Sequence, residues 1–246
     1  MKKGTLVIVR HGQSRFNELN IFTGWLDVPL SEQGIREAHK VADHCENFNY
    51  DAVFTSHLKR AHDTLMIILS KQKKIGVFQH QSDKRYDISN DMDPKLNNRI
   101  FRVYTVQDLN ERAYGALQGI DKDMATKTYG KLQVFKWRRG FTDKPPQGES
   151  LKEVYERITP FFKRTITPLL KRGKTILIVG HGNTLRALVK YLENIEDNEI
   201  QFVNLPLGHP LVYEYKEGRV NRVEGEYIVD KSASLNFNKN KGGEGR

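Results

Sequence analysis

The sequence predicts an α/β fold in which a mainly parallel sheet lies between two layers of helices. Three short apolar segments, at residues 5–9, 51–55 and 175–179, have the unalternated pattern of strands that are buried on both faces. Each is followed, directly or after a loop, by a segment whose apolar residues recur at helical spacing. Strands that alternate with helices are typical of a three-layer α/β/α sandwich with a mainly parallel sheet.

After the first strand and a loop, a helix is expected to begin at Ser31, a residue type that caps helix N-termini. The apolar residues of this helix recur at steps of three and four, which predicts one buried face. They are Ile35, Ala38, Ala42 and Cys45. Cys45 is therefore predicted to be a packed thiol rather than a reactive one.

Between the second and third buried strands, the chain predicts a helix, a polar excursion, a β-like segment and a loop. The helix follows Ser56, and its apolar residues are Leu58, Ala61, Leu65 and Ile68. Residues 71–98, which are rich in Lys, Asp and Asn from Ser82 onward, are expected to form a loop or a small hairpin. Residues 100–106 have a β-like pattern, and glycines punctuate residues 108–119.

The second half of the chain predicts two helices, a buried strand, a third helix and a terminal hairpin. These elements are expected at residues 122–129, 149–170 and 175–179, from about residue 183, and at residues 210–223. Pro160 falls inside the second of these helices and is expected to kink it. The sequence contains no internal repeat.

Composition excludes several classes of protein. The chain has 246 residues, of which 38% are hydrophobic, which is enough for a real core and too apolar for wholesale disorder. The apolar run near the start, residues 6–9, is too short to cross a membrane or to form a signal peptide. A single cysteine excludes an internal disulfide and a thiolate-rich metal site. We expect a cytoplasmic protein that does not associate with membranes.

The net charge of +10, from 40 basic and 30 acidic residues, points to an anionic partner. Nucleic acid binding would need a basic stripe with aromatic residues placed for stacking, whereas most basic residues here alternate with acids. The exceptions are Lys71–Lys74, the pair Arg138 and Arg139, and residues 231–246. We therefore expect a small anionic substrate rather than nucleic acid.

Polar and ionisable residues follow each of the three buried strands. In open α/β sheets, ligands bind beyond the carboxyl ends of the strands. The residues that follow the strands here are Arg10-His11-Gly12, the segment from Ser56 to Arg60, and His181-Gly182-Asn183. Gly12 and Gly182 would let a ligand approach the backbone, and a helix from about Asn183 would aim free N–H groups at it. Such a pocket suits a dianionic phosphate.

Two histidines at strand ends suggest phosphoryl transfer, because a neutral imidazole is a competent nucleophile towards phosphorus. Arg10 and Arg60 offer planar forks for phosphate oxygens, and His181 is a further donor if protonated. Glu111 is the candidate for protonating the leaving oxygen. The alternative is that Glu111 is a surface carboxylate paired with Arg112. For the other histidines we expect structural roles; they are His39, His44, His57, His62, His80 and His209.

Residues 9–14, together with His181-Gly182, resemble the histidine phosphatase superfamily, and within it the cofactor-dependent phosphoglycerate mutases. Further segments resemble that family's motifs in the same order. They lie at residues 22–25, 56–61, 109–112, 114–119, 137–139 and 182–188. The resemblance covers about residues 5–215, and the ordered set of motifs is far more specific than the Arg-His-Gly triplet alone.

The resemblance implies that His11 becomes phosphorylated, that Arg10, Arg60 and His181 hold the transferring phosphoryl group, and that Glu111 donates and accepts protons. The residues that it implies for substrate binding are Asn17, Thr23, Gly24, Arg112, Tyr114, Lys122, Arg138, Arg139, Gly182 and Asn183. A mutase must keep a doubly phosphorylated intermediate bound while that intermediate turns round. It therefore needs a second anionic anchor, which a simple phosphatase does not.

The implied activity is the interconversion of 3-phosphoglycerate and 2-phosphoglycerate, with 2,3-bisphosphoglycerate as primer and no metal, in a homodimer. The alternatives are a phosphatase or a bisphosphoglycerate synthase on the same scaffold, and an inactive scaffold that binds partners. One catalytic domain is expected over residues 1–230, with an inserted polar loop at 82–99 and a flexible tail at 231–246. The role of the insertion and any closure of the tail over the site stay open.

Overall fold

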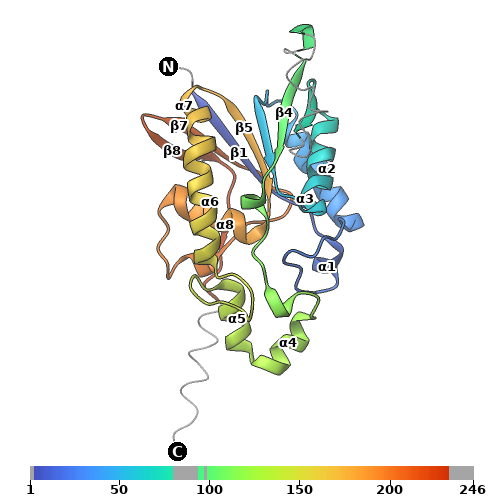
Figure 1. The fold of residues 1–246 in the computed structure, drawn as a ribbon, viewed down its shortest axis with the longest axis vertical. Coiled ribbons are helices and arrows are strands. Elements are labelled where there is room, and N and C mark those ends of the chain that lie inside the picture. Colours follow the sequence, from blue (N-terminus) through green and yellow to red (C-terminus); the bar gives the residue numbers. More distant parts are fainter. Residues whose placement is uncertain (1–2, 80–93, 97–98, 233–246) are drawn as a thin grey trace, which may run out of the picture.

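A seven-stranded sheet forms the centre of the protein (Figure 1). The computed structural model describes residues 3–79, 94–96 and 99–232. The strand order is β3-β4-β2-β5-β1-β7-β8. The bounds, in that order, are Ile75–Gln79, Ile100–Thr105, Ala52–Thr55, Thr175–Gly180, Gly4–Arg10, Leu211–Lys216 and Arg219–Glu224. The strands from β3 to β1 are parallel, and β7 and β8 complete the sheet in antiparallel pairing, so the predicted mainly parallel sheet is confirmed.

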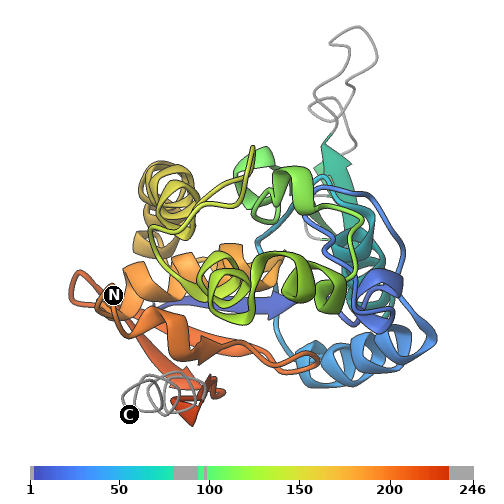
Figure 2. The ribbon, with the colours of Figure 1, turned by 90° about the horizontal axis from the view of Figure 1, so that it is seen from below.

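Helices cover both faces of this sheet, which gives the predicted three layers (Figures 1 and 2). Helices α2 (Glu32–Cys45) and α3 (Lys59–Ser70) cover one face, and α6 (Leu151–Phe161), α7 (Thr167–Lys171) and α8 (Gly182–Glu193) cover the other. Strand β1 supplies both cores, because side chains alternate across a strand. Leu6 and Ile8 pack on the α8 side, and Val7 and Val9 pack on the α2 side.

A third group of elements lies across the carboxyl end of the sheet (Figure 2). It contains the short helix α1 (Arg15–Glu18) together with α4 (Lys122–Tyr129) and α5 (Lys131–Arg139). Beneath α4 and α5 lies a separate small core of Phe22, Tyr114, Leu117, Ala125, Val134 and Trp137. These elements form a cap above the strand ends.

A second, two-stranded sheet lies next to α5 of this cap, where Arg139 donates hydrogen bonds to the carbonyl oxygens of Gln201 and Val203. Strand β6 (Val203–Asn204) pairs in antiparallel fashion with β9 (Ile228–Val229). Glu193, at the end of α8, accepts hydrogen bonds from the hydroxyl groups of Tyr213 (2.7 Å) and Tyr227 (3.0 Å). The chain that follows β8 is therefore tied back to both α8 and β6.

The sequence predictions hold for most of the larger elements but differ from the structure at several places. The segment predicted as a loop or hairpin contains the parallel strand β3, which the sequence hides because it is short, includes Gly76 and leaves Ile75 exposed. Helices α1 and α5 and the short strands β6 and β9 were not predicted. The long helix predicted at 149–170 is divided: α6 ends one residue after Pro160, and a π-helical segment (Phe162–Ile166) joins it to α7.

The predicted buried face of α2 is wrong at one position. Ile35 is 44% exposed, and Gly34 takes the buried position beside Ala38 and Ala42. A β-carbon on Gly34 would lie 2.0 Å from the carbonyl oxygen of Gln13, so only glycine lets α2 pack this close to the loop after β1. Cys45 is buried as predicted, and burial raises the pKa of its thiol to about 11.

Most of the predicted insertion and tail lie outside the described residues. The described part of the insertion, a 3-10 turn at Pro94–Leu96, lies at the end of the molecule opposite α4 and α5 (Figure 1). Further 3-10 turns occupy Gln107–Leu109, Gly115–Leu117 and Ile200–Phe202. None of the helices in the described ranges has the length and hydrophobicity to span a bilayer.

The contact between Gly34 and Gln13 can be tested by substitution. Gly34→Ala would force two backbone segments apart, so we expect the free energy of unfolding to fall by about 3 kcal/mol. Urea denaturation followed by circular dichroism measures this loss. Lys40→Ala, on the exposed face of the same helix, is the control and should change stability by less than about 0.5 kcal/mol. Equal stability of the Gly34→Ala variant and the wild type would contradict the argument.

Candidate active site

Parallel pairing of β1 with β5 brings the first and third strand ends together. Arg10 lies opposite Gly180 in this register, so the next residues, His11 and His181, are neighbours. The centroids of the two imidazole rings lie 4.9 Å apart. The expectation that both histidines share one site is therefore met by the geometry.

A cavity of about 160 Å³ opens beside these histidines at the carboxyl end of the sheet. Its walls contain most of the residues predicted for the site. They are Arg10, His11, Asn17, Thr23, Gly24, Arg60, Glu111, Tyr114, Lys122, Arg138, Arg139, Gly182 and Asn183, and Ile21, Phe22, Arg186 and Asn204 complete the lining. Of the predicted residues, Arg112 and His181 do not line the cavity but lie directly behind residues that do.

His11 presents an unprotonated nitrogen. Its Nδ1 lies 2.6 Å from the carbonyl oxygen of Gly12, which can only accept, so the ring hydrogen is on Nδ1. The lone pair of Nε2 then accepts from Arg60 Nε at 3.3 Å. Burial lowers the pKa of His11 well below its ordinary value, and the charges of Arg60 and Arg10 lower it further. His11 is therefore a neutral imidazole with Nε2 available as a nucleophile.

The arginines around the cavity donate hydrogen bonds to backbone carbonyl groups, which leave the positive charge of each guanidinium group uncompensated. Arg10 donates to Leu205 O (2.6 Å), Arg139 donates to Gln201 O and Val203 O (both 3.0 Å), and Arg186 donates to Ile200 O (2.7 Å). In the described part of the chain none of these guanidinium groups pairs with a carboxylate. Burial lowers the pKa of Arg10 and brings that of Arg139 to about 10. These guanidinium groups concentrate positive charge around the cavity, and a bound anion would neutralise that charge.

Arg60 is anchored in the same way. It donates to the carbonyl oxygens of Gly24 (2.8 Å) and Leu26 (3.1 Å), so the loop after α1 holds it against His11. Burial lowers its pKa to about 10. Gly24 has φ +53°, and a β-carbon there would lie 2.1 Å from Gln118 Oε1, so this loop requires glycine.

Glu111 is the carboxylate of the cavity wall. It is 9% exposed, and its Oε1 accepts from the backbone N–H groups of Arg112 (2.8 Å) and Asn183 (3.1 Å). The alternative of a surface carboxylate paired with the Arg112 side chain is therefore wrong. Helix α8 begins at Gly182, and of the N–H groups in its first turn that of Asn183 is taken by Glu111.

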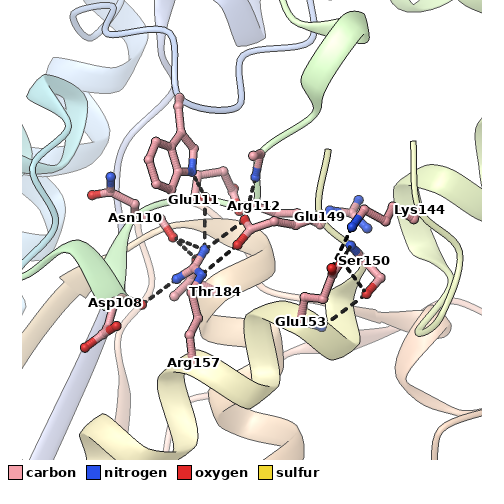
Figure 3. Close-up of polar contacts among 12 residues, drawn as sticks. Asp108, Asn110, Glu111, Arg112, Lys144, Glu149, Ser150, Glu153, Arg157 and Thr184 are labelled. Carbon is pink, nitrogen blue, oxygen red and sulfur yellow. Dashed lines mark hydrogen bonds and ion pairs between the residues drawn. The ribbon is translucent and has the colours of Figure 1, made fainter. Parts of the chain in front are cut away.

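A second layer of contacts holds the Glu111 loop (Figure 3). Arg157 of α6 donates to the carbonyl oxygens of Asp108 (2.5 Å) and Asn110 (2.8 Å) and forms a salt bridge with Glu149 at 3.0 Å. Glu149 also accepts from the backbone of Ala113 at 2.8 Å. The position of Glu111 is thus fixed by a helix outside the cavity.

Tyr114 has a hydroxyl hydrogen that is free to face the cavity. Its oxygen accepts from Arg112 Nη2 (2.8 Å) and from Asn183 Nδ2 (3.3 Å), and Arg186 Nη1 fixes the amide of Asn183 by donating to its Oδ1 at 2.9 Å. Because both donors approach the oxygen, the hydroxyl of Tyr114 donates elsewhere. Arg112, expected to bind substrate, is fully buried and acts on the cavity through Tyr114.

Of the two glycines at the strand ends, Gly182 lines the cavity, whereas Gly12 does not. A β-carbon on Gly12 would lie 2.3 Å from the carbonyl oxygen of Gly34, so Gly12 is required for packing against α2 rather than for ligand approach. On Gly182 it would lie 3.3 Å from the guanidinium carbon of Arg10. Gly182 therefore leaves room for a charged group of the site.

Sequence reasoning missed Arg186, Asn204 and the side chains of Ile21 and Phe22. Arg186 lies one helical turn after Asn183, inside a recognised motif, and that spacing is the signal that places it on the same face of α8. For Asn204 the sequence offers no signal, because its place depends on the pairing of β6 with β9.

Comparisons with known proteins agree with this geometry. Residues 6–84 and 94–225 match the sequence model of the histidine phosphatase superfamily (branch 1), and the chain belongs to that superfamily. Within it, a 2,3-bisphosphoglycerate-dependent phosphoglycerate mutase from Methanosarcina acetivorans is 40% identical over 94% of this chain and 99% of its own. The mutase of the same name from Chlamydia pneumoniae is 38% identical over 88% of this chain and 96% of its own.

Solved structures share the fold. A mycobacterial glucosyl-3-phosphoglycerate phosphatase superposes with a TM-score of 0.70 at 19% identity, covering 94% of this chain and 100% of its own. The alpha-ribazole phosphatase from Shigella flexneri gives 0.68 at 18% identity, covering 92% and 96%. At such low identity the likeness concerns the architecture alone.

The buried histidines predict how stability depends on pH. Burial holds the pKa of His11 and that of His181 well below the ordinary value of about 6.5, so each takes up a proton in the unfolded chain but not in the folded protein. The free energy of unfolding should therefore fall as the pH decreases from about 6.5 to about 5, by up to about 1.4 kcal/mol per pH unit for each histidine.

Urea denaturation at a series of pH values measures this slope. His11→Gln removes one of the two groups, and its slope should be smaller than that of the wild type by up to one proton. His39→Gln, at an exposed position on α2, should leave the slope unchanged. Equal slopes for wild type and His11→Gln would show that His11 is protonated in the folded protein.

Proposed function

We propose that this protein interconverts 3-phosphoglycerate and 2-phosphoglycerate through a phosphorylated His11 and 2,3-bisphosphoglycerate. The observation that carries the proposal is that one cavity contains two groups of anion-binding side chains. One surrounds His11 and includes Arg10 and Arg60, and the other consists of Lys122 and Arg138 on α4 and α5, with Arg139. The names of relatives near 40% identity support the same activity.

Each phosphoryl transfer is carried out by His11 and Glu111. When phosphorylated His11 gives up its phosphoryl group, the P–N bond to Nε2 breaks, an O–P bond to the substrate hydroxyl forms, and Glu111 accepts the hydroxyl proton. In the return transfer Nε2 attacks the other phosphorus, its O–P bond breaks, and Glu111 protonates the leaving oxygen. Arg10 and Arg60 neutralise the oxygens of the phosphoryl group in both directions.

Residues of the cap would bind the carboxylate and the phosphate group of the substrate that is not being transferred. Lys122 of α4 and Arg138 of α5 lie on the cavity wall away from the β1 end, where they suit a carboxylate or a second phosphate. Burial lowers the pKa of Lys122, and the charge of Arg138 lowers it further, so the two cations repel each other until an anion binds. A doubly phosphorylated intermediate would satisfy both groups of side chains at once.

The residues fit 2,3-bisphosphoglycerate as a primer. The buried Nε of Arg10 and hydroxyl of Thr23 have no hydrogen-bond partner in the described part of the chain, so donors are available to an anion. When bound, the primer supplies the phosphoryl group that charges His11. The guanidinium groups supply the positive charge that a metal would bring, and we propose that the reaction needs none.

Two further proposals come from the likeness to the mutases. We propose that the protein acts in the cytoplasm and as a homodimer. The other activities expected on this scaffold are hydrolysis of phosphoglycerates and synthesis of bisphosphoglycerate. Lys122 and Arg138 favour the mutase over a simple phosphatase, because hydrolysis needs no second anchor.

A coupled assay with 3-phosphoglycerate tests the activity directly. Isomerisation should proceed in the presence of a chelator and accelerate on addition of 2,3-bisphosphoglycerate. His11→Ala should abolish both turnover and the phosphorylated enzyme, while His39→Ala should retain both. Activity that is lost with chelator and restored by manganese, or phosphate release without isomerisation, would contradict the proposal.

The second anchor has its own prediction. Lys122→Ala removes one cation from the cap, and we expect the KM for 3-phosphoglycerate to rise about 10- to 100-fold, the value of a charged hydrogen bond. Release of phosphate from 2,3-bisphosphoglycerate should rise relative to isomerisation, because the intermediate escapes more readily. Lys127→Ala, on the exposed side of α4, is the matched control. An unchanged KM would mean that Lys122 does not touch the substrate.

A further inference from the structure

Ser56 lies behind the reacting histidines and contacts only one of them. Its Oγ is 2.7 Å from Nε2 of His181, and both side chains are fully buried. Pairing of β2 with β5, which sets Thr55 opposite Val179, fixes this contact, because Ser56 and His181 follow those strands directly. The resemblance to known enzymes assigned Ser56 no role.

Counting hydrogens decides which group donates. Burial lowers the pKa of His181 far below its ordinary value, with Arg60 adding to the effect, so the ring is neutral and carries one hydrogen. Ser56 Oγ already accepts from the backbone N–H of Leu58 at 3.1 Å. If Nε2 carried the hydrogen, the Ser56 hydroxyl would find no acceptor within the described residues, and Nδ1 would also lack a partner.

The opposite arrangement gives each of these polar atoms a hydrogen-bond partner, except Nδ1 of His181. If Ser56 donates to Nε2, its oxygen still accepts from Leu58, and the ring hydrogen moves to Nδ1. Nδ1 is buried and has no partner among the described residues. The centroids of this ring and of the His11 ring lie 4.9 Å apart, so a phosphoryl group on His11 would be close to His181 and could supply the acceptor for Nδ1.

We propose that Ser56 is a positioning residue that holds neutral His181 in the Nδ1–H tautomer, so that His181 donates to the phosphoryl group without being protonated. The expectation from sequence was that His181 donates once protonated. The role in transfer rests on the proposed function, but the tautomer does not. Thr55, whose hydroxyl donates to Val179 O at 3.0 Å, is the matched control because it is equally buried and one residue away.

The tautomer can be read without any turnover. Nitrogen-15 spectra of protein labelled at histidine distinguish protonated from unprotonated ring nitrogens, and His181→Gln assigns the signals. We expect a protonated Nδ1 and an unprotonated Nε2 in the wild type. Ser56→Ala should move the hydrogen wholly or partly to Nε2, whereas Thr55→Val should leave the spectrum unchanged. A protonated Nε2 in the wild type would overturn the proposal, even if no variant folds.

Kinetic measurements test whether Ser56 affects phosphoryl transfer to His11. Ser56→Ala should slow the phosphorylation of His11 by 2,3-bisphosphoglycerate about 10- to 100-fold, up to the loss expected when an oxyanion donor is removed. The KM should stay within about twofold of the wild type, because the second anchor is untouched, and Ser56→Thr should restore the rate. A Ser56→Ala rate equal to that of Thr55→Val would overturn the role in transfer. A wild type with the Nδ1–H tautomer but no isomerisation would instead contradict the proposed function.

Discussion

The parallel register between β1 and β5 is the constraint on which the site depends. It sets Arg10 opposite Gly180, and the two chains then leave the sheet side by side with their histidines in contact. A shift of one residue would exchange the side chains that face the two cores, for which their sizes are not matched, and would separate the imidazole rings. The hydrophobic packing of Leu6 and Val7 on opposite faces therefore also specifies the chemistry.

The buried positive charge of the arginines is the second feature on which the site depends. Carbonyl groups hold the guanidinium groups in place without neutralising them, so their positive charges repel one another and an anion would relieve the repulsion. Three of these arginines reach the same short segment, residues 200–205, which also pairs with β9. This one segment thereby sets the positions of several side chains that line the cavity, so binding of an anion and stability of the segment are linked.

Sequence patterns predicted the parts of the fold that depend on local hydrophobicity and missed those that depend on pairing. The buried strands and the helix at Lys59–Ser70 were found because their residues are apolar at the expected period. Strand β3 was missed because it pairs with β4 alone and is partly exposed. Likewise, Gly12 was assigned to the ligand because no pattern reveals that Gly34 packs on it. Motifs located the side chains of the site, but only coordinates assign each hydrogen-bond partner.

The order of the strands has a consequence for synthesis of the chain. Strand β1 is synthesised long before its two neighbours, β5 and β7, which are made only from Thr175 and Leu211 onward. Until then a wholly apolar segment has both edges free, the condition under which nascent chains associate wrongly. The central pairing of the sheet can therefore form only late in synthesis, and protection of β1 from wrong pairing until then would favour the native fold.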